Sequence, residues 1–352
     1  MLKNKRVRGV MSVDYNVLKD LVKVPSVSGR EELVREVIVR HLKPHVDEIR
    51  TDALGNVIAL IKGSSERKVA IECHYDQVGF IVKSIEKSGL LRIEPIGGID
   101  VRTIIGSRLI IWGREKTIPG VVAGVKPVHL EEKKEQIPKI GELYVDAGFD
   151  SSEDASKYVR VGDVATYDLQ YMELFNDKIA ATGLDNKISA FIMIELSKRV
   201  QDIGDWNLYL VFTSQEEVGL RGARTAFYGI YPEMAISLDV THAQYPPISQ
   251  SKVPIELGKG PAIMIAPAVH PKVLKLLEDA AQRGSVGVQY ETAGRFTGTN
   301  LDAIQVTRSG IPGGLVSIPL KYMHTPLEVA SKKDVESTIA LLESFLRLIK
   351  EI

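Results

Sequence analysis

The sequence contains very little cysteine: Cys73 is the only one among its 352 residues. An internal disulfide is therefore excluded, and so is a zinc site built from several thiolates. The chain also lacks a run of about 18 apolar residues that could span a membrane. No apolar segment follows the basic residues near the start, so a secretory signal is not predicted. Together these absences predict a cytoplasmic protein.

Neither sign of charge is in excess, because 45 Lys and Arg residues balance 45 Asp and Glu residues. A general nucleic-acid binder needs a basic surplus, so we expect neither a nucleic-acid partner nor a membrane partner. Hydrophobic residues make up 44% and charged residues 26%, which is typical of a globular protein. At roughly 100–200 residues per domain, the length allows two or three domains.

Two kinds of local pattern divide the chain. Residues 1–76 and 169–352 contain apolar strands and amphipathic helices in alternation, with predicted helices at 187–200 and 333–349. This alternation is typical of an α/β layer architecture. Residues 77–168 consist instead of short β-rich runs separated by glycines, which is typical of a small β-barrel or sandwich. We therefore predict a discontinuous α/β domain that carries an inserted β-rich domain.

Several shorter elements are predicted as well. Six β-rich runs are expected within the insert, at 79–85, 90–95, 107–112, 117–125, 142–148 and 163–167. Ser28, followed three residues later by Glu31, is typical of a capping box and predicts that the Ser28 side chain caps a helix over about 31–42. A further helix is predicted over 301–309.

Short polar islands follow apolar strands or begin helices at five places. They are His74–Asp76, Gly183–Lys187, Gln215–Gly219, Leu238–His242 and Tyr322–Pro326. Loops at strand ends bind ligands in open α/β sheets, and each island puts a histidine or carboxylate there. Each island alone has an ordinary explanation: Glu-Glu pairs are usually solvated, histidines often lie in cores, and Asp185 could cap a helix. Their recurrence at comparable positions favours one shared site.

The residue types in these islands indicate a metal site. Nitrogen and oxygen ligands suit Zn, Co or Mn. Two histidines and at least three carboxylates exceed the three protein ligands of a usual catalytic zinc, so we predict two divalent ions that share a carboxylate and activate a water between them. Glu216 and Glu217 are adjacent and can divide the roles of proton acceptor and ligand. Asp76 can reach the second ring nitrogen of His74 and fix its tautomer.

The sequence resembles the tetrahedral aminopeptidases and glutamyl aminopeptidases of metallopeptidase family 42 over almost its whole length. The most specific matching runs are Gln215–Ala223 and Tyr322–Pro326, and further matches lie at Val27–Gly29, Leu54–Asn56, His74–Phe80, Ile96–Gly98, Leu184–Lys187, Asp239–His242 and Leu257–Pro261. The resemblance implies a mixed-sheet α/β metallopeptidase domain of the phosphorylase/hydrolase-like kind, with an inserted PDZ-like β-barrel. It also implies dimer contacts through the insert and a hollow tetrahedral homododecamer.

Carried over by motif, the resemblance also implies a ligand set for two divalent metal ions, with Zn or Co favoured and Mn allowed. His74, Asp185 and Asp239 would bind one ion. Asp185, Glu217 and His324 would bind the other, so that Asp185 bridges the two.

The remaining site residues follow from the same resemblance. Glu216 would act as general base and then general acid, and Asp76 would orient His74. The family usually has Thr-Asp-Ala where this chain has Thr299-Asn300-Leu301. Asn300 is therefore expected at the substrate pocket as a neutral replacement for a carboxylate, which predicts a preference for neutral over Lys or Arg side chains.

The resulting prediction is a metallo-aminopeptidase that removes N-terminal residues from short peptides. The first alternative is an amidohydrolase that cleaves N-acyl amino acids with the same metals. A second is an endoglucanase that uses paired carboxylates as acid and base, although this leaves His74 and His324 without a role. A non-catalytic binding or assembly protein is disfavoured because Glu216 and every candidate ligand are present.

Overall fold

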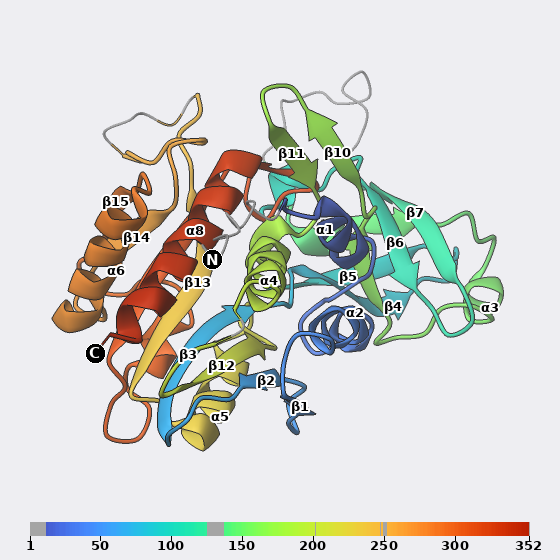
Figure 1. Ribbon diagram of the computed structural model, residues 1–352. Helices are drawn as coiled ribbons and strands as arrows, with labels where there is room; N and C mark the ends of the chain where they lie inside the picture. Colours follow the sequence, from blue (N-terminus) through green and yellow to red (C-terminus); the bar gives the residue numbers. More distant parts are fainter. Residues whose placement is uncertain (1–11, 125–136, 201, 247, 249–251, 352) are drawn as a thin grey trace.

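The computed structural model describes residues 12–124, 137–200, 202–246, 248 and 252–351. The basic segment 1–11 and position 125 of the predicted strand 117–125 lie outside this range. At the centre is an eight-stranded mixed sheet in the order β1-β2-β12-β3-β13-β16-β14-β15 (Figure 1). Its strands are β1 (Glu48–Thr51), β2 (Val57–Ile61), β3 (Arg67–His74), β12 (Trp206–Thr213), β13 (Met234–His242), β14 (Ala262–Ile265), β15 (Gln289–Thr292) and β16 (Gly313–Leu320).

Four central strands of this sheet, β12, β3, β13 and β16, run parallel to one another. Their carboxyl ends therefore meet at one edge of the sheet. In the register of these strands, Thr213 lies opposite His74 and Cys73 lies opposite Leu238. Asp239 follows Leu238 directly, so the strand register alone brings two of the polar islands side by side.

Helices cover both faces of the sheet. Five of them share one hydrophobic core, namely α1 (Tyr15–Val22), α2 (Glu32–Leu42), α4 (Leu184–Ser197), α6 (Pro271–Gly284) and α8 (Lys332–Ile349), and two lie on the other face, α5 (Arg221–Ile230) and α7 (Leu301–Ile304). Strand side chains alternate between these cores: Val69 and Ile71 join the first, and Ala70 joins the second. The prediction of an α/β layer architecture is confirmed.

A closed antiparallel barrel follows β3 in the sequence (Figure 1). The remaining strands and helices of the α/β layers come after it. Its order is β4-β5-β8-β7-β6-β9. The bounds are β4 (Gly79–Ile85), β5 (Leu91–Ile96), β6 (Arg108–Trp112), β7 (Thr117–Ala123), β8 (Tyr144–Asp146) and β9 (Val164–Tyr167), with a short helix α3 (Ser152–Ala155). Five of the six predicted β-rich runs contain one of these strands, and the run 90–95 overlaps β5, which ends one residue later. The barrel has its own apolar core, in which Phe80 packs edge-on against Tyr167 at 5.5 Å between ring centroids.

A small antiparallel sheet pairs two strands that follow the barrel with one strand that precedes the C-terminal helix α8. It consists of β10 (Tyr171–Leu174), β11 (Lys178–Ala181) and β17 (Glu328–Ser331). β11 leads into the Gly183–Lys187 island at the start of α4, and β17 follows the Tyr322–Pro326 island, so this sheet fixes the position of two polar islands. Among the described residues, no helix combines the length and apolarity needed to cross a membrane.

Two local predictions are wrong. Ser28 does not cap α2: its hydroxyl donates to Asp76 Oδ2 at 2.6 Å, and the residue at the cap position is Glu31, which makes no side-chain cap bond. The predicted helix 301–309 ends at Ile304. Residues 305–309 form turns instead, with Arg308 in the left-handed region at φ 53°.

Candidate metal centre and active site

Three of the expected ligands form a first cluster at the carboxyl edge of the sheet. His74 ends β3, Asp239 lies near the end of β13, and Asp185 lies at the start of α4. His74 Nε2 is 3.2 Å from Asp185 Oδ1 and 3.5 Å from Asp239 Oδ1. One atom from each residue lies within 4.8 Å of the others, close enough to hold a single metal ion.

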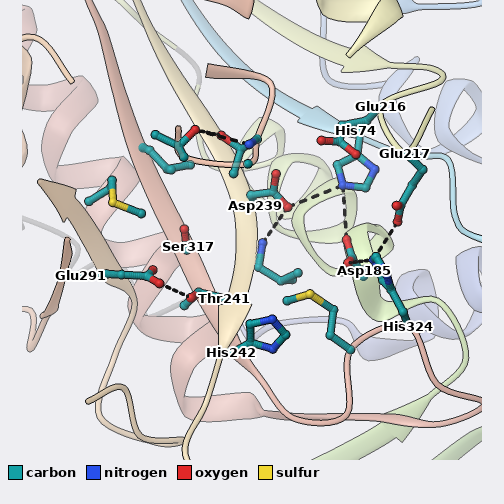
Figure 2. A pocket seen from close by; sticks show the side chains of 17 residues that line it. His74, Asp185, Glu216, Glu217, Asp239, Thr241, His242, Glu291, Ser317 and His324 are labelled. Atoms are coloured by element: carbon teal, nitrogen blue, oxygen red, sulfur yellow. Dashed lines mark hydrogen bonds and ion pairs between the residues drawn. The ribbon is translucent and has the colours of Figure 1, made fainter. Parts of the chain in front are cut away.

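A second cluster shares Asp185 with the first. His324 Nε2 is 3.1 Å from Asp185 Oδ2 and also 3.1 Å from Glu217 Oε1. Asp185 thus turns one carboxylate oxygen toward each histidine (Figure 2). The structure brings together all five residues for which metal binding was expected, in the two groups of three that were expected.

The atoms of these clusters fit divalent cations. Asp185 Oδ1 and Glu217 Oε1 are buried and receive no hydrogen bond, although an imidazole nitrogen lies within 3.2 Å of each. Buried carboxylate oxygens are normally satisfied, so two such atoms in one site fit a cation as their partner. Converging imidazole nitrogens and carboxylate oxygens are the donor set that Zn, Co and Mn accept.

The electrostatics of the site lead to the same conclusion. Burial alone lowers the pKa of His74, but the neighbouring Glu216 and Asp239 carboxylates outweigh it and raise that pKa well above its usual value. Burial raises the pKa of Glu216 to about 9, and the nearby Asp239 and Glu217 add to this effect while His74 opposes it. So many crowded carboxylates favour nearby positive charge, which divalent cations would supply with the imidazoles as neutral ligands.

Glu216 belongs to neither cluster, although it lines the same cavity as both. Its position is set by Asp76, whose Oδ1 accepts the Glu216 backbone N–H at 2.9 Å and whose Oδ2 accepts that of Glu217 at 3.2 Å. Asp76 Oδ1 also lies 3.5 Å from His74 Nδ1, while the Asp76 backbone oxygen is nearer, at 3.2 Å. The hydrogen-bond partner of His74 Nδ1 is thus the backbone oxygen of Asp76, while the Asp76 carboxylate fixes the segment that carries both glutamates.

Glu328, on β17, is a supporting residue that the sequence did not reveal. Its carboxylate accepts the backbone N–H of Asp185 at 2.9 Å and that of His324 at 2.8 Å. It thereby aligns two residues of the second cluster. The other ring nitrogen of His324, Nδ1, lies 2.6 Å from the backbone oxygen of Gly98, in a loop of the β-rich region. That contact fixes the tautomer that leaves Nε2 facing the carboxylates.

The structure places Asn300 away from the cavity. Its side chain is 1% exposed, and its amide donates to Glu72 Oε1 at 2.7 Å and to Thr213 Oγ1 at 2.9 Å. Glu72 also accepts hydrogen bonds from Thr213 and Ser237, so Asn300 completes a buried network behind the strand ends. Its neighbour Thr299 lines the cavity instead. The expected substrate contact of Asn300, and the preference for neutral side chains inferred from it, lose their structural basis.

The cavity beside the clusters has a volume of about 290 Å³, near the lower limit for small-molecule sites. The two clusters and Glu216 occupy one part of it, and Thr241, His242 and Glu291 occupy another (Figure 2). Glu291 was missed because its strand, β15, is only four residues long and was not predicted. The alternating sequence Gln289-Tyr290-Glu291-Thr292 was the available signal.

A mixed sheet whose parallel central strands carry histidine and carboxylate clusters at their carboxyl edge, beside a glutamate outside both clusters, is typical of a metal-dependent hydrolase. A family model described as M42 glutamyl aminopeptidase matches residues 55–341. The chain belongs to this family, and it is an aminopeptidase, a hydrolase that acts on peptides.

Individual relatives agree with this assignment. A lysyl aminopeptidase of Pyrococcus furiosus is 37% identical over 343 residues, which covers 96% of this chain and 98% of the relative. The structure of an aminopeptidase from Desulfurococcus kamchatkensis matches with a TM-score of 0.89 at 34% identity, over 94% of this chain and 93% of the other. The TET1 peptidase of Pyrococcus horikoshii, described as assembling into a tetrahedron or a large octahedral shell, matches with a TM-score of 0.84 at 27% identity over 94% and 98%.

Proposed function

We propose that this chain is a two-metal aminopeptidase that removes N-terminal residues from short peptides. The observation that carries the proposal is the position of Asp185, whose two oxygens face separate histidine–carboxylate clusters. A carboxylate in that position can bridge two cations held by His74 and Asp239 on one side and by Glu217 and His324 on the other. Zn or Co suits these ligands best, and Mn is also acceptable.

Two bound cations would polarise the scissile carbonyl and lower the pKa of the attacking water. Glu216 takes the proton from that water and delivers it to the leaving amine. Its burial keeps its pKa high enough to hold the proton between the two steps, and positive charge nearby lowers that pKa enough for the carboxylate to act as a base. Asp76 holds the backbone of Glu216 in place during both transfers.

The substrate's free amine and its first residue would occupy the cavity, and the remaining peptide would extend toward solvent. A volume of about 290 Å³ accommodates one residue rather than a long segment. We propose cytoplasmic peptides released by larger proteases as the source of substrates, consistent with a chain that has one buried cysteine and no disulfide.

The same proposal includes dimers that assemble into a tetrahedral homododecamer. The support is the assembly named for the Pyrococcus horikoshii relative, together with exposed apolar residues on the barrel, such as Val121 at 49% and Val161 at 62%. Residues 77–168 are proposed as the dimerisation domain. Twelve chains of 38.8 kDa would give roughly 470 kDa by light scattering, and a monomer with full activity would contradict the assembly.

The test of the activity compares one peptide with a free N-terminus and the same peptide with an acetylated N-terminus. We expect cleavage of the free form to be at least about a hundredfold faster, because the amine has to approach the clusters, and we expect EDTA to abolish it. Equal rates on both peptides would favour the N-acyl amidohydrolase instead. Retention of full activity after chelation would contradict a metal mechanism of either kind.

A further inference from the structure

Glu291 is a carboxylate in the cavity that the proposed chemistry does not use. It lies on β15 at the edge of the main sheet, and Figure 2 shows it across the cavity from His74 and His324. Thr241 Oγ1 donates to Glu291 Oε1 at 2.8 Å. Among the described residues, this is the only side-chain hydrogen bond to Glu291, so Oε2 remains available to a ligand.

The distance from the clusters to Glu291 suits one extended side chain. Asp239 and Thr241 are two residues apart on β13, so their side chains point to the same face and their Cα atoms are roughly 7 Å apart. Glu291 is hydrogen-bonded to Thr241, which places its carboxylate about one long side chain away from the Asp239 cluster. A substrate residue whose amine and carbonyl lie at the clusters can therefore reach Glu291 with its side-chain tip.

The cavity wall includes apolar side chains, together with the small polar residue Ser317. Met264 and Leu315 are buried and line the cavity, as do Val240 and Met323. An aliphatic stem with a positive tip matches such a wall followed by a carboxylate, because the methylene groups contact the apolar side chains while the charge reaches the acid. Lysine and arginine are the residues with this build.

The geometry points to Glu291 as the residue that selects a cationic side chain, Lys or Arg, at the substrate's N-terminus. This inference rests on the proposed aminopeptidase function and adds its specificity. Hydrogen bonds from a cation to a carboxylate are about twice as strong as neutral ones, and the partly buried setting of Glu291 reduces competition from water. A neutral or acidic side chain would leave that carboxylate unpaired.

The groups around Glu291 shift the pKa of its carboxyl group in both directions. Burial raises its pKa, whereas the Thr241 hydroxyl and the His242 imidazole lower it. His242 is exposed and also lines the cavity. A bound ammonium or guanidinium group would lower the pKa further and keep Glu291 ionised in the complex.

The experiment compares lysyl and norleucyl p-nitroanilides, which share the α-amine and the length of the stem but differ in the terminal charge. For the metal-loaded wild-type enzyme we expect kcat/KM to be at least tenfold higher for the lysyl substrate. In Glu291→Gln this ratio should fall to within about threefold of unity, mainly through loss of the lysyl rate. The norleucyl rate and the metal content should stay near wild type.

Glu115→Gln is the matched control, because Glu115 is an exposed glutamate on the barrel and its loss should leave the ratio unchanged. Equal wild-type rates on the two substrates would overturn the inference and leave the aminopeptidase function standing. A lysyl preference that persists in Glu291→Gln would also overturn it, because the selectivity would then come from elsewhere. Cleavage of neither substrate, nor of other free-amine peptides, would instead contradict the proposed function itself.

Discussion

The carboxyl edge of the main sheet and the core of the barrel differ in how many charged side chains they bury. At the sheet edge, buried ionisable groups crowd together from several elements: Glu72, His74, Asp76, Asp185, Glu216, Asp239 and Glu328. In the described part of the barrel, Asp163 is the one buried charged side chain, and it is paired with Arg160 at 3.0 Å. Burying charge is costly, so the sheet edge is built for chemistry and the barrel core for stability.

The largest expected effect is a loss of catalytic rate at the sheet edge without a loss of protein stability. Glu216→Gln should lower kcat by about 100- to 10,000-fold, because the variant loses the proton carrier. Metal content should stay near wild type, because Glu216 lies in neither ligand cluster. Stopped-assay rates and atomic emission on the same sample provide the two measurements. Turnover above about a tenth of the wild-type rate would refute the assigned role.

In the barrel we expect the reverse, a loss of stability with kcat unchanged. Phe80→Ala removes a fully buried ring that packs on Tyr167 and should cost about 3–5 kcal/mol of barrel stability. Denaturant unfolding measures this loss, with Thr117→Ala as a control on an exposed barrel position. The kcat of the remaining folded enzyme should be unchanged. A loss of kcat as large as that of Glu216→Gln would show that the two regions are not separable.

A smaller effect concerns the buried network behind the sheet edge. Asn300→Asp replaces the amide that donates to Glu72 with a second carboxyl. Two carboxyls in contact must share a proton, so we expect a loss of about 1–3 kcal/mol of stability near pH 8. Asn176→Asp, at an exposed position, is the control for added charge.

The pH dependence of this loss has a definite sign. Burial already raises the pKa of Glu72 to about 7, and removing an amide that lowers it raises it further. A folded-state pKa above the unfolded value of about 4.3 means that the folded state binds the extra proton. The variant should therefore approach wild-type stability near pH 4–5 and fall behind it as the pH rises through 7. A difference independent of pH would contradict the shared proton.

The ligand set could be predicted from sequence because each ligand follows a strand end or opens a helix, and parallel strands bring such ends to one edge. His74 and Asp239 are examples, since the register of β3 and β13 alone makes them neighbours. The direction of Asn300 could not be predicted, because it depends on how the short helix α7 is rotated against the sheet. A departure from a family motif does not indicate which way the side chain points.

Glu328 and Glu291 could not be identified for a related reason. Both lie on four-residue strands, β17 and β15, whose place in the fold depends on partners distant in sequence. β17 pairs with β11, and this pairing carries Glu328 to the start of α4. Short strands carry too little hydrophobic alternation to be recognised alone, so Glu328 and Glu291 emerge only from tertiary structure.

The most direct test of the central claim is a metal titration of the stripped enzyme. Zn²⁺ or Co²⁺ is added to the metal-free protein while hydrolysis of a free-amine substrate and bound metal are measured on the same sample. We predict that the metal-free protein is inactive and that activity reaches its maximum only as bound metal approaches two ions per chain, one for each cluster sharing Asp185. Full activity with no metal, or saturation of both activity and binding at one ion per chain, would contradict the account.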